Sequence, residues 1–273
     1  MERSTGYARL GSQRIAYEVF GSGSIDLVMT AGSFSAFDSD WEDPMAELFL
    51  RRLASFVRLI RFDRRGTGAS DPLPLDVLPP WESFVEELEC VMSQVGSERA
   101  AIMTAYDAGP MGMLFAATKP ACTAALILVN TGAKYIADDD YPIGVAPEVA
   151  DELNRTMADR WGGDEHVLLQ VPSKADDPRF RSWYAKKTRS IAGPAAAAAY
   201  FRSMFKADAR AMLPAVHAPT LVLHRTGCAD DGEVLVSRTV KDLTVGSEIS
   251  FEDRGVHELK GIDGAWELLA VRA

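Results

Sequence analysis

A phenol and a carboxylate stand next to each other where a short apolar stretch gives way to a helix. Tyr106 and Asp107 follow residues 100–105, which have strand length, and precede residues 110–118, which have the length and spacing of a helix. An ionised carboxylate can attack a saturated carbon and form an ester that water then cleaves, whereas a phenol can give or take a proton. The sequence therefore predicts a reactive group at a sharp turn between a strand and a helix.

Two alignments of this turn are open. A turn that projects a nucleophile needs small residues two positions before and two positions after it, because the strand and the helix pass close together there. Ala105 and Gly109 satisfy this rule around Asp107, whereas the alternative centres the turn on Tyr106, two positions before Ala108. As a further alternative, Asp107 caps the N-terminus of the following helix. We predict Asp107 and Tyr106 as catalytic residues and Ala108 as part of the substrate site.

Short apolar stretches alternate with longer helical stretches along much of the chain. Residues 14–20 alternate between apolar and polar and are expected to form an edge strand. Buried strands are expected over residues 25–30, 56–62, 100–105, 124–129 and 219–224, and helices over residues 45–54, 81–95 and 110–118. Buried strands separated by helices predict an α/β fold with a mostly parallel central sheet that is covered by helices on both faces.

This alternation breaks between residues 132 and 218, where alanine, charged and aromatic residues predominate. A helical segment between two core strands predicts a lid over the carboxyl edge of the sheet, where α/β sheets bind ligands. We therefore assign residues 132–218 to a helical lid and expect Tyr141 and Trp183 to bind substrate. Residues 1–131 and 219–273 form the core in this prediction, with a helix over residues 233–242, a strand over 248–252 and a strand or helix over 266–271.

Composition excludes several classes of protein. Of the 273 residues, 47% are hydrophobic and 25% are charged, which is typical of a globular chain. The net charge of -10 disfavours nucleic acid and anionic membranes as partners. The three cysteines, Cys90, Cys122 and Cys228, form neither a metal-binding spacing nor a disulfide framework. We expect a cytoplasmic protein with a small-molecule substrate, no metal and no cofactor; whether it forms a homo-oligomer is left open.

Three segments resemble motifs of the α/β-hydrolase fold family. Residues 31–34, Ala-Gly-Ser-Phe, resemble the glycine turn that supplies an oxyanion-hole amide in that family. Residues 63–70, Asp-Arg-Arg-Gly-Thr-Gly-Ala-Ser, closely resemble the family's Asp-x-Arg-Gly-x-Gly-x-Ser turn, and the junction at residues 105–109 resembles its nucleophile elbow. The resemblance covers roughly residues 7–227 and implies the α/β-hydrolase fold. It also implies that the substrate lies near Gly32, Ser33 and Phe34.

The subgroup that the chain resembles most is the hydrolase domain attached to bacterial adenylate/guanylate cyclases. Residues 41–44, 115–118 and 172–183 are similar to that subgroup. Residues 232–242 and 251–261 resemble the C-terminal end of such a cyclase, whose metal-binding core would lie between these two segments and is absent from the sequence. The resemblance implies a hydrolase domain joined to a cyclase remnant that has no cyclase activity.

The resemblance also implies where a general base and its partner acid belong. The base of the family follows the last strand, and His257 fits that position. The acid follows the strand at residues 219–224, where the family has an aspartate and this chain has Cys228, with Asp230 and Asp231 just beyond. We expect His257 as the base and Asp230 as the acid that orients it, with Cys228 as an alternative nucleophile.

The turn contains no serine, so the usual nucleophile of the family is missing there. Counted without gaps from Gly96, serine-bearing members of the family favour Tyr106 at the nucleophile position, whereas the small-residue rule favours Asp107. The sequence predicts a hydrolase of a small apolar ester, lactone or epoxide, and lid tyrosines are its candidate acids: Tyr135, Tyr141, Tyr184 and Tyr200. The alternatives are a non-hydrolytic lyase or cyclase that uses acid/base residues, and a ligand-binding protein without catalysis.

Overall fold

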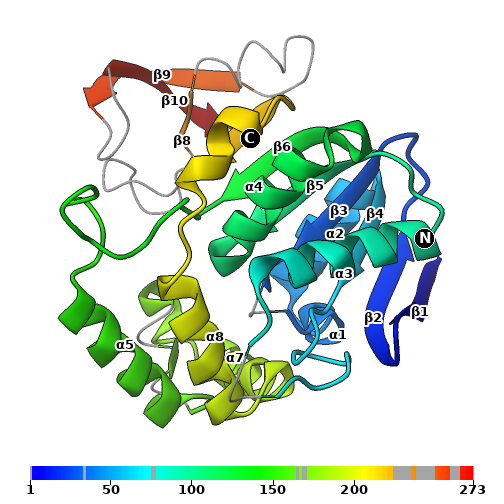
Figure 1. The fold of residues 1–273 in the computed structure, drawn as a ribbon, viewed down its shortest axis with the longest axis horizontal. Coiled ribbons are helices and arrows are strands. Elements are labelled where there is room, and N and C mark those ends of the chain that lie inside the picture. The colour runs from blue at the N-terminus through cyan, green and yellow to red at the C-terminus, as the bar shows by residue number, and fades with distance from the viewer. Residues whose placement is uncertain are drawn as a thin grey trace.

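A seven-stranded sheet forms the centre of the molecule (Figure 1). The computed structural model describes residues 2–32, 35–74, 78–163, 166–167, 171–223, 235–237, 250–258 and 265–272. In spatial order the strands are β1 (Arg3–Leu10), β2 (Gln13–Phe20), β4 (Arg58–Phe62), β3 (Asp26–Thr30), β5 (Ala100–Ala105), β6 (Thr123–Val129) and β7 (Thr220–Leu223). From β4 to β7 all neighbours are parallel, whereas β1 and β2 are antiparallel. The mostly parallel sheet is confirmed.

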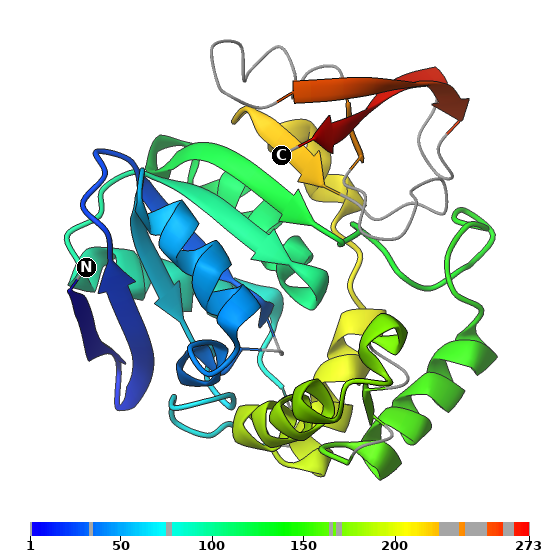
Figure 2. The same cartoon turned by 180° about the vertical axis from the view of Figure 1, so that it is seen from behind.

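Helices cover both faces of this sheet (Figures 1 and 2). Leu27 and Leu59 pack with Leu50 of α2 on one face. The next residues along β3 and β4, Val28 and Ile60, belong to the larger cluster formed with α3 and α4 on the other face. Because consecutive side chains of a strand point to opposite faces, continuous apolar strands serve both clusters. The three expected helices are confirmed as α2 (Pro44–Ala54), α3 (Trp81–Gln94) and α4 (Gly109–Thr118).

A helical segment lies between β6 and β7 and gathers at one end of the sheet (Figure 2). Helices α5 and α8 pack together, and Trp161, Ile191 and Phe201 belong to a third apolar cluster. The helices of this segment are α5 (Pro147–Arg160), η4 (Pro172–Lys174), α7 (Pro178–Ile191), α8 (Pro194–Phe205) and η5 (Arg210–Ala215). Elsewhere the short helices are α1 (Phe37–Asp40), η2 (Tyr106–Ala108) and η3 (Pro120–Cys122). None of the helices in the described ranges is long and apolar enough to cross a bilayer.

The prediction that residues 14–20 form an edge strand is wrong, because β1 pairs with β2 along its whole length. The sequence did not predict β1, because most of its residues are solvent-exposed and it therefore has no apolar run. The C-terminal segment also departs from expectation. Residues 235–237 form strand β8 (Leu235–Ser237), not part of a helix.

β8 pairs with β10 (Ala265–Arg272), which pairs with β9 (Ser250–Glu258) in a separate three-stranded sheet. These strands therefore do not extend the central sheet, in contrast to the expectation that the tail completes the core (Figure 1). All their described pairings are antiparallel.

Candidate active site

The turn after β5 has a strained backbone at Tyr106. This residue has a φ of +53°, a conformation that is rare for a bulky side chain. The loop after β6 holds the turn from outside, because the Tyr135 hydroxyl donates to the Tyr106 carbonyl oxygen over 2.8 Å and the Thr131 hydroxyl contacts the same oxygen. The side chain of Tyr106 is 48% exposed. Of the two alignments left open by the sequence, the positive φ coincides with the one centred on Tyr106.

A cavity of about 180 Å³ lies over this turn. It is lined by the residue after β3 (Ala31), the residue after β5 (Tyr106), Val171, and one face of α7 (Tyr184, Lys187, Thr188 and Ile191). Helix α7 therefore lies over the carboxyl ends of β3 and β5, where ligands of α/β sheets bind. The α7 residues are spaced i, i+3, i+4 and i+7, which is the signal by which the sequence could have identified Lys187 and Thr188.

Asp107 is buried behind Tyr106 and is 2% exposed. It packs against Gly32, whose φ is +65°, so closely that a methyl group on Gly32 would come within 2.4 Å of Asp107 Oδ1 and 2.9 Å of the Ala108 nitrogen. Its other oxygen, Oδ2, lies 3.5 Å from Nη1 of Arg64. The structure thus brings Gly32, Asp107 and Ala108 together, as the sequence predicts. The helix-capping alternative for Asp107 is wrong, because the N-cap of α4 is Ala108 and no side chain caps it.

The turn at residues 63–70 holds neighbouring loops in place. The Asp63 carboxylate accepts hydrogen bonds from the Ser35 hydroxyl at 2.6 Å and from the backbone N–H groups of Phe37 and Ala69 at 3.0 Å. Burial nevertheless raises the pKa of Asp63 to about 6. The segment after β3 is thereby fixed to the turn after β4.

The phenol of Tyr184 is held rigidly at the cavity. Its ring stacks between Phe180 and His166, with both centroids 5.8 Å away and interplanar angles of 23° and 24°. Burial raises the pKa of Tyr184 above its usual range, and burial raises the pKa of Tyr135 to about 12. Both hydroxyls therefore stay protonated at neutral pH and can donate hydrogen bonds.

The histidines lie in unrelated surroundings. His166 is fully buried beside Tyr184, and burial lowers its pKa to about 4, so its imidazole is neutral at pH 7. His257 lies within β9 rather than after the last strand, and its Nε2 is 2.7 Å from the carbonyl oxygen of Arg254 in the same strand. The sequence did not predict this position, because β9 continues to Glu258, beyond the strand that was expected over residues 248–252.

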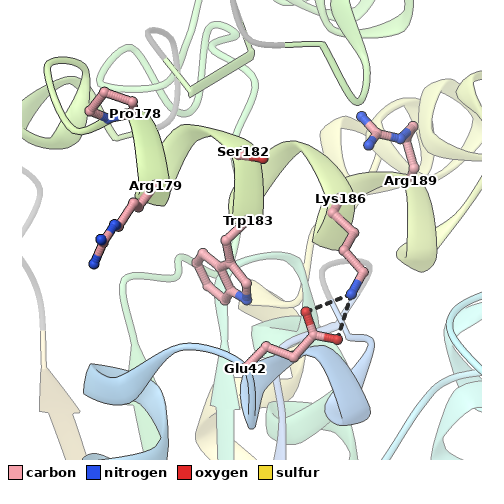
Figure 3. Close-up of a pocket in the computed structure, with 7 residues that line it drawn as sticks. All are labelled: Glu42, Pro178, Arg179, Ser182, Trp183, Lys186 and Arg189. Atoms are coloured by element: carbon pink, nitrogen blue, oxygen red, sulfur yellow. Dashed lines mark hydrogen bonds and ion pairs between the residues drawn. The ribbon is translucent and has the colours of Figure 1, made fainter.

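Trp183 and Tyr141 are not among the residues that line the cavity over Tyr106. Trp183 lines a hollow of about 610 Å³ on another side of α7 (Figure 3), and its indole N–H donates to the Ser39 carbonyl oxygen over 3.0 Å. In the same hollow, the Lys186 ammonium contacts both carboxylate oxygens of Glu42 at 2.7 Å. The Tyr141 ring faces the cations of Lys134 and Arg210, at 5.8 and 5.5 Å.

The remaining predicted site residues, Ser33, Phe34 and Asp230, lie outside the described residues, as does Cys228. Across the residues that are described, no group of three or more histidine, cysteine, aspartate or glutamate side chains could hold a metal ion.

Known proteins share this architecture. The family model described as the alpha/beta hydrolase family matches residues 27–261. A protein from Oryza sativa subsp. japonica that is named as a probable esterase is 22% identical over 223 residues, which cover 76% of each chain. An esterase from Exiguobacterium antarcticum superposes with a TM-score of 0.68 at 20% identity, over 81% of each chain. An enol-lactonase from Burkholderia xenovorans gives 0.63 at 19% identity, over 80% of each chain. These likenesses confirm the predicted fold, and the chain belongs to the alpha/beta hydrolase family.

Proposed function

We propose that this chain is a hydrolase that cleaves a small, uncharged ester or lactone by direct attack of water, without an acyl-serine intermediate. Membership of the alpha/beta hydrolase family and the likeness to proteins named as an esterase and an enol-lactonase support hydrolysis. The observation that carries the proposal is the arrangement at the turn, where Tyr106 and Tyr184 line one cavity and the next residue after Tyr106, Asp107, is buried.

Tyr106 occupies the nucleophile position of the turn in this proposal, which the positive φ at that residue supports. A phenol hydroxyl extends much further from the backbone than a serine hydroxyl does. Attack by the Tyr106 oxygen would therefore place the substrate carbonyl far from the amides of the turn. We assign Tyr106 and Tyr184 to hydrogen bonding with the substrate's carbonyl oxygen instead, because both line the same cavity.

The position of Asp107 favours the same assignment. A carboxylate packed against Gly32 opposes the build-up of negative charge on a substrate oxygen at that turn. Negative charge is better placed at the hydroxyl groups of Tyr106 and Tyr184, which line the cavity. Asp107 then takes a proton from water, the resulting hydroxide attacks the carbonyl carbon, and the proton passes to the leaving oxygen as the C–O bond breaks.

Cavity size and charge limit the substrate. A volume of about 180 Å³ is below the range of about 300–1,000 Å³ that is usual for ligand pockets. The Lys187 ammonium at its edge is already paired with Asp40, so it does not call for an anionic substrate. The helices of residues 132–218 serve as the lid over this small, mostly apolar space.

The proposal is tested with small p-nitrophenyl esters, γ-lactones and one small epoxide as substrates. D107N should lower kcat by roughly 100-fold or more, and Y184F by roughly 10–100-fold. Y141F is the matched control, because this tyrosine contacts cations away from the residues that line the cavity, and its kcat should stay within about twofold of wild type. Full turnover by D107N would refute the role of Asp107.

Isotope labelling separates direct attack from a covalent intermediate. A single turnover in ¹⁸O-labelled water should place the label in the acid product at once. If Asp107 attacks the carbonyl carbon instead, a mixed anhydride forms as the C–O bond to the leaving oxygen breaks. When water then cleaves this anhydride at the Asp107 carbonyl, the first acid product carries an oxygen from the enzyme, and the label appears only in later turnovers. That result would contradict water as the attacking group.

A second candidate function is ligand binding without catalysis. It is favoured by the hydrogen bond that ties His257 to its own strand β9. Saturable binding of a small ester, with no hydrolysis by the wild-type protein at any pH between 5 and 9, would support this function over hydrolysis.

We also propose that the chain is related to the hydrolase domains attached to bacterial cyclases and that it is located in the cytoplasm. The separate three-stranded sheet supports a distinct origin for the tail, because its described strands pair with one another and not with the central sheet.

A further inference from the structure

Arg64 lies next to the candidate site without contacting its cavity. Its side chain is 1% exposed and is the largest of the fully buried side chains in the described part of the chain. Three rings surround the guanidinium, at 4.1 Å for Phe84, 5.0 Å for Tyr200 and 5.6 Å for Trp81. A planar cation enclosed by rings is held in one orientation, because the rings leave it little room to rotate.

Two buried carboxylates, those of Glu87 and Asp107, lie near Arg64. Glu87, which is also buried, binds both the guanidinium of Arg65, at 2.6 Å, and the Arg65 backbone N–H, at 3.1 Å. The ion pair that the structure gives Arg64 is with Asp107, and Nε of Arg64 has no hydrogen-bond partner among the described residues. A buried cation is strongly destabilising without an opposite charge.

We propose that Arg64 is the positioning residue for Asp107. Nη1 of Arg64 draws Oδ2 of Asp107 toward the aromatic rings, which leaves Oδ1 at the Gly32 turn. The role of Asp107 as the base rests on the proposed function, but the electrostatic coupling between the two side chains does not.

The helical segment takes part in this arrangement through α8. Tyr200 of α8 places its ring against the Arg64 guanidinium, and its hydroxyl donates to the Arg65 carbonyl oxygen. Trp81 and Phe84 approach from α3, on the core side. The orientation of Arg64, and through it that of Asp107, therefore depends on how the helical segment is seated on the core.

The experiment is a double-mutant cycle measured by urea unfolding, in which D107N is combined with R64M or with R58M. Arg58 is the matched control, because it pairs with Asp26 at the amino ends of β3 and β4, the opposite edge of the sheet. The effects of R64M and D107N on the urea midpoint should be coupled, whereas those of R58M and D107N should be additive. In assays, R64M should lower kcat by roughly 10-fold or more with little change in KM, and R64K should restore most of this loss.

Removal of a buried cation can also destabilise the fold, and the double variant covers that case. R64M removes the cation beside the buried Asp107 charge, so the R64M/D107N double variant should unfold at a higher urea concentration than R64M. Additive effects of R64M and D107N on the urea midpoint would overturn the proposal. Coupled effects in a protein that hydrolyses nothing would refute the proposed function and leave the positioning role intact.

Discussion

Replacing Gly32 with alanine tests the packing of the turn after β3 against Asp107. The φ of +65° at Gly32 costs an L-residue about 1–2 kcal/mol. The new methyl group would lie 2.4 Å from Asp107 Oδ1 and 2.9 Å from the Ala108 nitrogen, both closer than van der Waals contact. Because the carboxylate is buried and the nitrogen belongs to the main chain, relief requires a shift that costs about 1–3 kcal/mol. The total loss in the free energy of unfolding should be about 2–5 kcal/mol.

Gly11 provides the matched control. It has a φ of +61° in the turn between β1 and β2, and a methyl group there meets no atom within 4 Å. G11A therefore carries the backbone cost alone, about 1–2 kcal/mol. Urea unfolding followed by far-UV circular dichroism measures both variants, and the difference between them is the cost of crowding at Asp107 and Ala108.

The double variant G32A/D107A identifies the atom responsible. Removing the carboxylate removes the nearer of the two contacts, so G32A should cost less in the D107A background than in wild type, by about 0.5–3 kcal/mol. If G32A is no more destabilising than G11A, or costs the same in both backgrounds, the inferred packing of Gly32 on Asp107 is wrong.

Other side chains give further tests. Glu18 is inaccessible to solvent and pairs with an arginine of β4, so E18Q should lower the free energy of unfolding by about 3–5 kcal/mol. E42Q removes a charge from an exposed ion pair and should lower it by less than about 1 kcal/mol. Equal losses for the two variants in urea unfolding would contradict this prediction. Asp63 has a pKa raised from 3.8 to about 6, so the stability that its protonated form provides below pH 4 is lost as the pH rises through 6. Relative to D63N, this loss is about 3 kcal/mol. The melting temperatures of wild type and D63N are compared between pH 4 and 7, and a difference that does not change with pH would contradict the reasoning. Y135F removes a hydrogen bond to the Tyr106 carbonyl oxygen and should cost about 1 kcal/mol, whereas an unchanged melting temperature would show that the bond does not stabilise the turn.

The sequence predicted the strands and helices that carry their own periodic signal. β3 to β6 and helices α2, α3 and α4 lie within a few residues of the predicted ranges, because apolar runs and helical spacing are properties of short segments. β1 lacks such a run, and only its pairing with β2 reveals it as a strand. In the tail, the sequence predicted a helix where the structure has a strand. Residues 235–237 lie within the predicted helix but form a strand by pairing with β10.

The candidate site shows the same division. The sequence located the turn, since a polar pair between a strand and a helix is visible locally, but it could not decide between Tyr106 and Asp107. The backbone at Tyr106 is fixed by Thr131 and Tyr135, which come from the loop after β6. Because these hydrogen bonds come from residues distant in the sequence, the residue types at the turn itself do not reveal its backbone conformation.

By itself, the sequence determined the α/β class, the order of the core elements and the place of the turn that carries Tyr106 and Asp107. Tertiary structure alone decided which side chains meet there. Gly32, Arg64 and Asp107 are separated by dozens of residues and come together because parallel strands bring their carboxyl ends to one edge of the sheet. The tertiary structure also placed His257 in a separate sheet, because a local sequence pattern does not predict which strands pair with each other.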